Sequence, residues 1–459
     1  MLLESFLTEY DEIINSELNT DPLGFLVIWS AFGQQIFRSR VSSISNDVRN
    51  YTLNLFNHWL VHELTEDDSV VLGKALVKRY AGKHDRSFKN ACLVYLENIF
   101  AYSMVKHESL PNINSTGVLG ISKARNQWNL QNGNPVLRFG HDPKAHLLEN
   151  QLSLGVSGRY KTPLVEMGFF DRAYNYNAPE SILLWSKVRR MITATPILKK
   201  LADVLKDHLC KLLKHDAEIS HSFNVLPESL SKALVHAFPS PVAVGNYSRD
   251  FWLDVSGLNQ GALSALYKTL RQSDTPGALN SAHTADLFAQ ALLEDLSPPE
   301  KLKLEHIRLI EPLLAELDLL FSLMLSALQQ SLSDVAKLWG RIGRNEETLT
   351  GLAKPIANNK EMFEVLSSTG QARLNRLLEV SEATSVHLQI RRLLTYHENV
   401  MERRGQSPWL VLREDSELKL NVRPRHFSSN DERPVGSWIN EYYIPQFRNL
   451  LNGLQGGAA

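Results

Sequence analysis

The sequence predicts a mainly α-helical, multi-lobed protein with a loop-rich central region and a small β-hairpin near its C-terminus. Apolar residues recur at helical spacing through most of the 459 residues. Glycine, proline and aromatic residues gather instead between 107 and 180. Near the end, the stretches PWLVLRE and ELKLNVRP alternate apolar and polar residues, a pattern typical of paired strands. These three observations decide the fold class.

Composition divides the chain into five expected domains. They are an N-terminal helical domain (1–106), a Gly- and aromatic-rich loop region (107–180), a basic-to-neutral helical domain (181–297), a long-helix bundle (298–404), and a hairpin with a terminal helix (405–459). Pro298-Pro299 precedes a long helix that we expect to reach Trp339, with Pro312 as a site where it could kink.

Both ends of the chain carry further expectations. An acidic amphipathic stretch with Leu2, Phe6, Ile13 and Leu18 precedes a stop near Asp21-Pro22. The turn of the hairpin is expected at Asp415-Ser416, followed by a polar loop over 425–436. The last helix should be broken at Pro445.

Bulk composition narrows the class of protein. Hydrophobic residues make up 43% and charged residues 22%, as in ordinary globular proteins. Two distant cysteines, Cys92 and Cys210, argue against a disulfide framework and favour a cytoplasmic location. The first residues lack the basic start of an export signal, and the most apolar run, 313–328, is too short and too charged to span a bilayer. We therefore expect no membrane association, no cofactor and no bound metal.

Charge is distributed unevenly along the chain. Residues 1–68 carry a net charge of −8, residues 69–215 carry +12, and residues 216–459 carry −5. A basic middle between acidic flanks predicts a surface for a polyanion, most often nucleic acid. The alternative is that the basic middle packs against the acidic ends of this chain or against a partner.

The best candidates for phosphate contacts lie in this basic middle, within the helices expected over 187–214 and a glycine-containing loop before them. Part of the helical charge is paired internally at i,i+4 spacing. The predicted nucleic-acid-binding residues are Arg159, Lys161, Lys187, Arg189, Arg190, Lys199 and Lys200.

The stretch GVSGRYKT, 155–162, resembles a phosphate-binding loop of the form G-x-x-x-x-G-K-[ST] with one position changed. Tyr160 stands where the second glycine belongs, and a bulky side chain there opposes the required backbone conformation. The preceding residues are typical of a helix and not of a buried strand. An ordered loop that makes at most a single phosphate contact is the favoured interpretation.

Two histidine pairs are weaker candidates for metal binding. His58 and His62 have the i,i+4 spacing that can hold zinc, but no third ligand is visible and apolar neighbours favour a structural role. His141-Asp142 resembles the dyad of metal-dependent phosphohydrolases, but it precedes Pro143 in the loop region. Neither pair predicts a metal site.

One catalytic alternative rests on the R-x(4–6)-H pattern of HEPN-type ribonucleases. Arg392 and His397 in RLLTYH fit this spacing, as do Arg391 and His397. Arg79 and His84 also fit, although the Gly between them makes a poor helix. The resemblance implies a metal-independent ribonuclease with Arg392 and His397 as its catalytic residues. An exposed basic helix face is the competing interpretation.

A binding module is also conceivable in the same region. The expected order is helix, turn at Thr369-Gly370, helix, third helix and hairpin, which resembles a winged helix. Arg373 and Arg376 would then face a DNA groove, and the hairpin would form the wing with Lys419 and Arg423. A helical bundle capped by a hairpin remains the simpler interpretation.

These observations favour a non-catalytic cytosolic accessory subunit that binds nucleic acid through its basic central region within a larger protein complex. Bacterial DNA-processing or anti-phage defence systems commonly contain such motif-poor helical subunits. A protein–protein scaffold without a nucleic-acid role and a HEPN-like ribonuclease are the alternatives.

Overall fold

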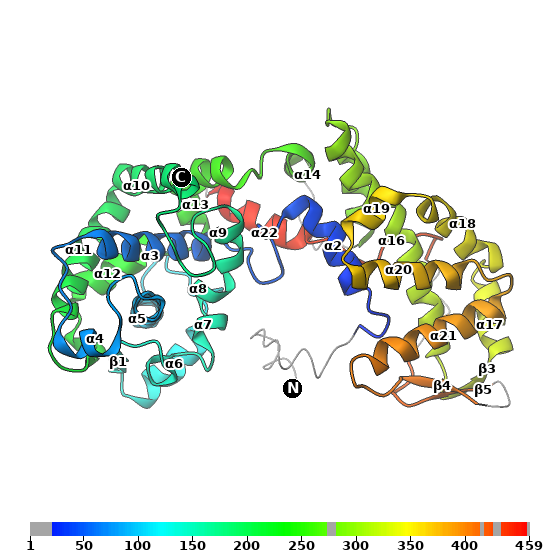
Figure 1. Ribbon diagram of the computed structural model, residues 1–459, viewed down its shortest axis with the longest axis horizontal. Helices are drawn as coiled ribbons and strands as arrows, with labels where there is room; N and C mark the ends of the chain where they lie inside the picture. Colours follow the sequence, from blue (N-terminus) through cyan, green and yellow to red (C-terminus); the bar gives the residue numbers. More distant parts are fainter. Residues whose placement is uncertain (1–20, 273–280, 414–416, 426–432, 457–459) are drawn as a thin grey trace. The chain divides into compact units, whose positions relative to one another are not determined.

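The computed structural model describes residues 21–272, 281–413, 417–425 and 433–456, and the statements below concern these residues. They form two compact units (Figure 1). The first unit contains 38–258 and 446–456, and the second contains 21–37 and 259–445. The five expected domains follow composition and do not coincide with these units, so that division stays a prediction from the sequence.

The first unit is built from helices joined by long connections. Its α-helices are α3 (Val48–Glu66), α4 (Lys74–Arg79), α5 (Arg86–His107), α6 (Ile121–Leu130), α7 (Gln151–Leu154), α8 (Val156–Arg159), α9 (Lys161–Glu166), α10 (Ile182–Ala194), α11 (Pro196–Leu213), α12 (Glu228–Ala237) and α13 (Pro241–Ser256). Three short 3₁₀ turns lie at Pro143–Ala145, Pro179–Ser181 and Phe223–Val225. Strands β1 (Val136–Arg138) and β2 (Ser220–Ser222) pair antiparallel, with Leu137 opposite His221.

Helices α3 and α5 form the centre of the first unit and are buried almost all round. Helix α3 packs on α5, α13 and α8, and α5 also packs on α6 and α12. The side chain of Asp47 caps α3 by accepting hydrogen bonds from the amides of Arg49, at 2.7 Å, and Asn50. Helices buried on all sides carry no polar stripe, which explains their weak amphipathic pattern.

Polar side chains of these two central helices order the loop-rich region. The buried guanidinium of Arg49 donates to the carbonyl oxygens of residues 114 and 116. Asn98 donates to the carbonyl of residue 145 at 2.8 Å, and Lys89 to that of residue 174 at 2.7 Å. Because buried main-chain groups need partners, these contacts allow a long irregular segment to pack inside the unit.

The second unit is also helical. It contains α2 (Leu26–Phe37), α14 (Gly261–Gln272), α15 (Ser281–Ala291), α16 (Pro298–Met324), α17 (Leu332–Arg341), α18 (Glu346–Ala357), α19 (Lys360–Val365), α20 (Ser368–Ser381) and α21 (Val386–Glu402). Strands β3 (Gln329–Ser331), β4 (Leu410–Leu412) and β5 (Glu417–Leu420) form an antiparallel sheet in the order β3-β5-β4. The last helix, α22 (Ile444–Gln455), starts here and continues into the first unit.

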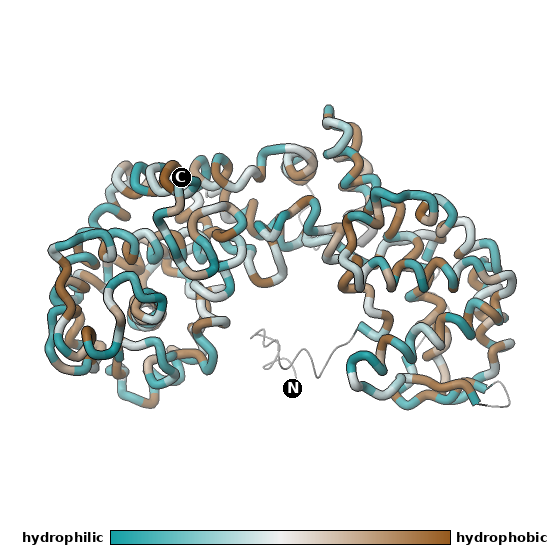
Figure 2. Tube along the Cα trace, in the orientation of Figure 1, coloured by the Kyte–Doolittle hydropathy of each residue, from teal (hydrophilic) through white to brown (hydrophobic). Residues whose placement is uncertain are grey.

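Helix α16 is the central element of the second unit, and α2, α14, α15, α17, α18 and α21 all pack against it. In Figure 2, hydrophobic and hydrophilic stretches alternate along the helices of this unit, as expected for amphipathic helices around a core. Glu311 of α16 accepts hydrogen bonds from the amides of Ile439 and Asn440, at 2.7 and 2.8 Å. Glu316 forms a buried two-bond ion pair with Arg344. These carboxylates fix the segment before α22 along α16.

The structure confirms the mainly α fold with a small sheet near the C-terminus. Two details of the expected elements are wrong. The helix expected over 300–339 ends at Met324, because β3 intervenes before α17. Pro445 does not break the last helix but stands in its first turn, where a proline needs no amide partner.

Some expectations fall on residues outside the described ranges. They concern the acidic stretch before Asp21, the hairpin turn at Asp415-Ser416 and most of the polar loop that follows the hairpin. The hairpin strands themselves are β4 and β5, with Leu412 opposite Leu418. Strand β5 also pairs with β3, which the sequence did not predict.

Candidate anion-binding groove

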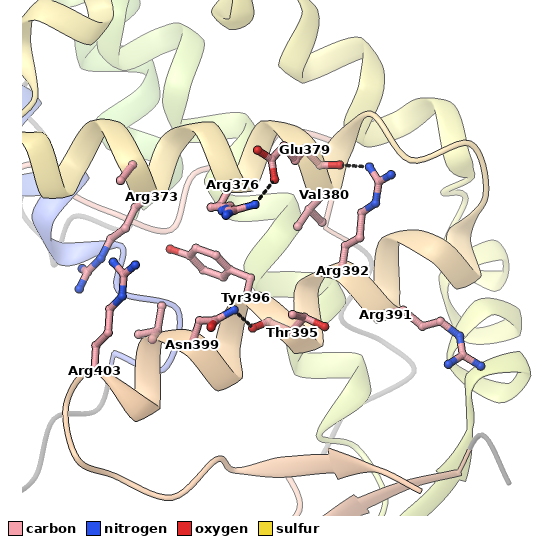
Figure 3. Close-up of a pocket in the computed structure, with 12 residues that line it drawn as sticks. Arg373, Arg376, Glu379, Val380, Arg391, Arg392, Thr395, Tyr396, Asn399 and Arg403 are labelled. Atoms are coloured by element: carbon pink, nitrogen blue, oxygen red, sulfur yellow. Dashed lines mark hydrogen bonds and ion pairs between the residues drawn. The ribbon is translucent and has the colours of Figure 1, made fainter. Parts of the chain in front are cut away.

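A groove of about 730 Å³ lies between α20 and α21 in the second unit (Figure 3). Its volume falls in the range of ordinary ligand sites. Arginine is its most frequent residue. The lining comprises Ala372, Arg373, Arg376, Glu379, Val380, Arg391, Arg392, Thr395, Tyr396, Asn399, Val400 and Arg403.

The local sequence explains how the groove forms. Leu374, Leu377 and Leu378 of α20 are buried, as are the leucines 393 and 394 of α21. Ser367 and Ser385 cap the two helices by accepting from amides three residues ahead, at 3.2 and 3.3 Å. Only four residues, 382–385, join the helices, so they run antiparallel as neighbours and their outer faces border the groove.

The arginines are spread along the groove and are not gathered at one point. In Figure 3, Arg373 and Arg403 lie near one end, Arg376 lies between, and Arg391 and Arg392 lie toward the other end. Arg391 and Arg403 are twelve positions apart in the sequence, which corresponds to a helical rise of about 18 Å. Five guanidinium groups oppose one carboxylate, that of Glu379. The groove is therefore strongly positive along its length.

Internal contacts hold several of these arginines in place without removing their charge. Arg376 forms an ion pair with Glu379 at 2.8 Å, and both side chains are more than half exposed. Such a pair contributes only about 0–1 kcal/mol, so an external anion can compete for it. Arg392 donates to the main-chain oxygen of Glu379, and Arg373 donates to that of Gly24 at 2.6 Å. A main-chain carbonyl orients a guanidinium but leaves its positive charge unneutralised.

The floor of the groove is apolar and rigid. Val380, Val400 and the ring of Tyr396 are buried beneath the arginine heads. The hydroxyl of Tyr396 donates to the carbonyl of Leu23 at 2.7 Å, which fixes the ring. A positive rim over an apolar floor can hold phosphates at the edges and a flat apolar group between them.

His397 does not point into the groove, although Arg392 lines it. Its Nδ1 lies 2.9 Å from the carbonyl oxygen of Pro22, and the amide of Trp409 donates to its Nε2 at 2.9 Å. These partners fix a neutral ring with the proton on Nδ1. Burial lowers the pKa of His397 below its usual value. Because both nitrogens bond to the main chain inside the unit, the geometry gives no support to a ribonuclease pair of Arg392 and His397.

The structure does not have the winged-helix arrangement that the sequence pattern resembled. Thr369 and Gly370 do not form a turn but lie in the first turn of α20. Strand β5 is the middle strand of a three-stranded sheet, so the hairpin is not a free wing. Arg373 and Arg376, which that hypothesis placed against nucleic acid, do line the groove.

In the first unit, residues 155–162 lie in and beside the short helices α8 and α9, and the buried side chain of Glu97 contacts their backbone. The carboxylate of Glu97, buried in α5, accepts hydrogen bonds from the amide of Ser157 at 2.7 Å and from Gln151 at 3.0 Å. A Cβ at Gly155 would lie 2.2 Å from Glu97 Oε2, so glycine permits this approach. Tyr160, between α8 and α9, is buried. The amide of Ser157 that a phosphate would need is occupied by Glu97. The ordered loop expected here is wrong in form, because residues 156–159 and 161–166 are helical.

The histidine pairs have structural surroundings. His58 is buried among aromatic rings, with Nδ1 2.9 Å from the hydroxyl of Tyr176, and burial lowers its pKa to about 3. His62 Nε2 lies 2.9 Å from Asn177 Oδ1. Asp142 forms an ion pair with Arg79. Within the described ranges, no group of three or more His, Cys, Asp or Glu side chains is arranged to hold a metal ion.

The predicted phosphate-contacting residues of the basic middle differ in their surroundings. Lys161 lies 4.2 Å from the centre of the Tyr174 ring and donates to a main-chain carbonyl. Lys187 pairs with Asp254 at 2.8 Å, and Arg189 pairs with Glu63. Arg159 is half-buried at the end of α8, whereas Arg190, Lys199 and Lys200 are exposed on α10 and α11.

The acidic flank therefore neutralises part of the basic middle. Glu63 pairs with Arg189, and Asp67 pairs with Lys206 at 2.9 Å. The hydrogen bond from Lys206 holds the pKa of Asp67 well below its usual value. Both contacts join the N-terminal acidic segment to α10 and α11 within one unit, as the alternative interpretation of the charge layout expects.

Comparison of the chain with protein-family models, with curated proteins and with solved structures returned no match. Among the described residues, no helix combines the length and the apolar character needed to cross a membrane.

Proposed function

We propose that the arginine-lined groove binds an extended polyanion, and specifically a strand of nucleic acid. The observation that carries this proposal is the placement of five arginines from two helices along about 18 Å of groove. Phosphates of one duplex strand recur about every 3.4 Å along the axis, so this length spans about five of them. A single phosphate group would be matched better by arginines gathered at one point.

The type of cation also favours phosphate. A guanidinium presents a planar fork of donors that can engage two phosphate oxygens at once. Its flat face can also stack on a base, and the apolar floor of Tyr396 and Val400 gives a base somewhere to lie. These features recognise the backbone and a flat ring without reading a base edge. We therefore expect binding with little sequence preference.

The wider role remains the one that the sequence suggested. In this proposal the protein is a non-catalytic accessory subunit that brings nucleic acid to a larger cytosolic assembly. The groove offers arginines, one carboxylate and an apolar floor, and its described lining contains no histidine or cysteine. An acidic protein partner is the second candidate, because an acidic segment presents the same sign of charge.

The test compares two triple variants of the whole chain. In the groove variant, Arg376, Arg392 and Arg403 are changed to glutamine. In the matched variant, the exposed cations of the first unit, Arg190, Lys199 and Lys200, are changed to glutamine. Each variant loses three positive charges, so a difference between them cannot arise from net charge. Circular dichroism and thermal unfolding check that both variants fold.

Fluorescence anisotropy of labelled single- and double-stranded oligonucleotides measures binding. We expect a loss of affinity of at least tenfold in the groove variant and less than threefold in the matched variant, since each charged hydrogen bond to phosphate is worth about 1.5–3 kcal/mol. The reverse pattern would favour the basic middle over the groove. Tight binding of polyglutamate without binding of any oligonucleotide would favour the acidic protein partner.

A further inference from the structure

One end of the groove differs from the rest of its length, because residues 21–24 of the second unit bridge the two helices there. Arg373 of α20 donates to the carbonyl oxygen of Gly24 at 2.6 Å. The Tyr396 hydroxyl of α21 donates to the carbonyl oxygen of Leu23 at 2.7 Å. The bridging residues are buried, so they are a fixed part of the unit. A strand that follows the groove therefore meets this bridge and ends here.

Two arginine side chains come together at this end, one from α20 and one from the C-terminal end of α21. In Figure 3, the guanidinium groups of Arg373 and Arg403 point toward each other beside the ring of Tyr396. Burial raises the pKa of Tyr396, and the positive charges of Arg373 and Arg403 oppose this rise, so both groups lie close to the phenol. This end of the groove therefore concentrates two positive charges over one ring.

The two guanidinium groups are held differently. Arg373 is half-buried and fixed on the carbonyl of Gly24, whose φ of +66° and missing Cβ allow this close approach. Arg403 is exposed, and among the described residues its side chain makes no hydrogen bond or ion pair. The neighbouring Arg404 already has an anion, since it pairs with Asp21 at 3.5 Å. The end therefore offers one rigid guanidinium and one that can turn toward a ligand.

This charge suits a phosphate at the end of a strand better than one inside it. An internal phosphodiester carries one negative charge. A terminal phosphate monoester carries about −1.5 to −2 at pH 7 and has three strong acceptor oxygens. Two guanidinium forks can engage such a group from two sides, with two hydrogen bonds each.

We propose that Arg373 and Arg403 bind the terminal phosphate of a single strand whose backbone follows the rest of the groove. This inference rests on the proposed function, because the other arginines must hold the backbone for the strand end to reach this site. The protein is then a binder of phosphorylated strand ends and not of internal segments. A 5′-phosphate and a 3′-phosphate offer the same chemistry, and the experiment separates them.

Competition binding to the full chain measures the contribution of the terminal phosphate. Unlabelled single strands of about six nucleotides, the length that the groove can hold, displace an internally labelled strand. They share one sequence and carry a 5′-phosphate, a 3′-phosphate or hydroxyl groups at both ends. We expect at least one phosphorylated strand to bind at least about tenfold more tightly than the hydroxyl strand, because it gains a hydrogen bond between charged groups.

A matched competitor separates a terminal site from the effect of added charge. A strand one nucleotide longer, with hydroxyl groups at both ends, has one more phosphodiester but no terminal phosphate. We expect it to gain less than about threefold over the shorter hydroxyl strand. A gain as large as that from the terminal phosphate would overturn the inference, because charge alone would then account for it.

Two variants locate the site within the groove. Arg403→Gln removes a guanidinium from the proposed site, and Arg392→Gln removes one toward the other end (Figure 3). Circular dichroism checks that both variants fold. In Arg403→Gln, the phosphorylated and hydroxyl strands should bind within about threefold of each other. Arg392→Gln should weaken both strands and keep their tenfold ratio.

The outcomes separate this inference from the proposed function. A ratio near one in the unchanged protein, or the same loss of the ratio in both variants, would overturn the terminal site while strand binding stands. Binding of the phosphorylated strand alone would support the terminal site and refute the proposed contacts along the groove. Failure of every strand to bind would refute both.

Discussion

The salt dependence of oligonucleotide binding follows directly from the number of arginines in the groove. A protein that neutralises Z phosphates of a single strand shows a slope of about −0.7Z in a plot of log K against log salt. Three to five of the arginines in the groove can meet phosphates at once. The expected slope is therefore about −2 to −3.5.

This slope corresponds to a large effect over an accessible range. Raising the salt concentration from 50 to 200 mM should weaken binding by about 20- to 130-fold. The variant with Arg376, Arg392 and Arg403 changed to glutamine retains two groove arginines, so its slope should not exceed about −1.4 in magnitude. Anisotropy titrations at four or five salt concentrations measure both slopes.

Removing a negative charge from the groove should have the opposite effect on binding. Glu379 pairs with Arg376 inside the groove, and it repels an incoming phosphate. Changing Glu379 to glutamine should tighten binding about two- to fivefold at low salt, because a surface pair is worth up to about 1 kcal/mol. Damage to the fold cannot produce a gain. An unchanged slope in the triple variant, or weaker binding in the Glu379→Gln variant, would refute the assignment of the groove.

Three further predictions concern stability, each measured by urea unfolding. Gly155→Ala should lower the free energy of unfolding by about 2–4 kcal/mol, because the new Cβ would lie 2.2 Å from the buried Oε2 of Glu97. The control is Gly351→Ala, where no atom lies within 4 Å of the new Cβ, and we expect it to leave stability unchanged or raise it. The pKa of His58 is about 3 in the folded chain against 6.5 unfolded, so the unfolded chain binds more protons between these values. His58 should therefore account for about 2 kcal/mol of the loss in the free energy of unfolding between pH 7 and pH 5, and in His58→Gln this loss should be smaller by that amount. Arg344→Met should lower the free energy of unfolding by about 3–5 kcal/mol, because it leaves the buried carboxylate of Glu316 without its cation. A decrease below about 1 kcal/mol would contradict a stabilising role for this ion pair.

Periodicity in the sequence was enough to predict a helical protein, but not where its longest helix ends. The stripe of apolar residues continues past Met324 to Trp339, so the pattern favours one helix. A local signal for a new start was present at Ser331, whose side chain and that of Asp334 form a capping box. Strand β3 before it pairs with β5, some ninety residues later, and no local pattern predicts such a partner.

The net charge of a long region did not indicate the groove, because the acids elsewhere in that region outnumber its bases. Residues 216–459 carry a net charge of −5, and this sum gives no sign of a basic site. The arginines at 373 and 376 are separated in sequence from those at 391, 392 and 403. The short link over 382–385 could have indicated that α20 and α21 are antiparallel neighbours, which would have brought the two groups together.

The basic residues over 69–215 are partly neutralised by ion pairs within the first unit. Arg189 and Lys206 face Glu63 and Asp67, so two cations of this surface already have anionic partners. Exposed pairs of this kind are weak, however, at about 0–1 kcal/mol, and a phosphate could displace them. The two surfaces thus differ in geometry more than in charge. The groove places arginines on both sides of an apolar floor, whereas the cations of α10 and α11 stand on exposed helix faces. If the basic middle binds by charge alone, changing Arg190, Lys199 and Lys200 should weaken binding equally for any polyanion. If the groove binds, changing Arg376, Arg392 and Arg403 should weaken binding of strands that can enter it and not of bulky polyanions such as heparin-coated beads.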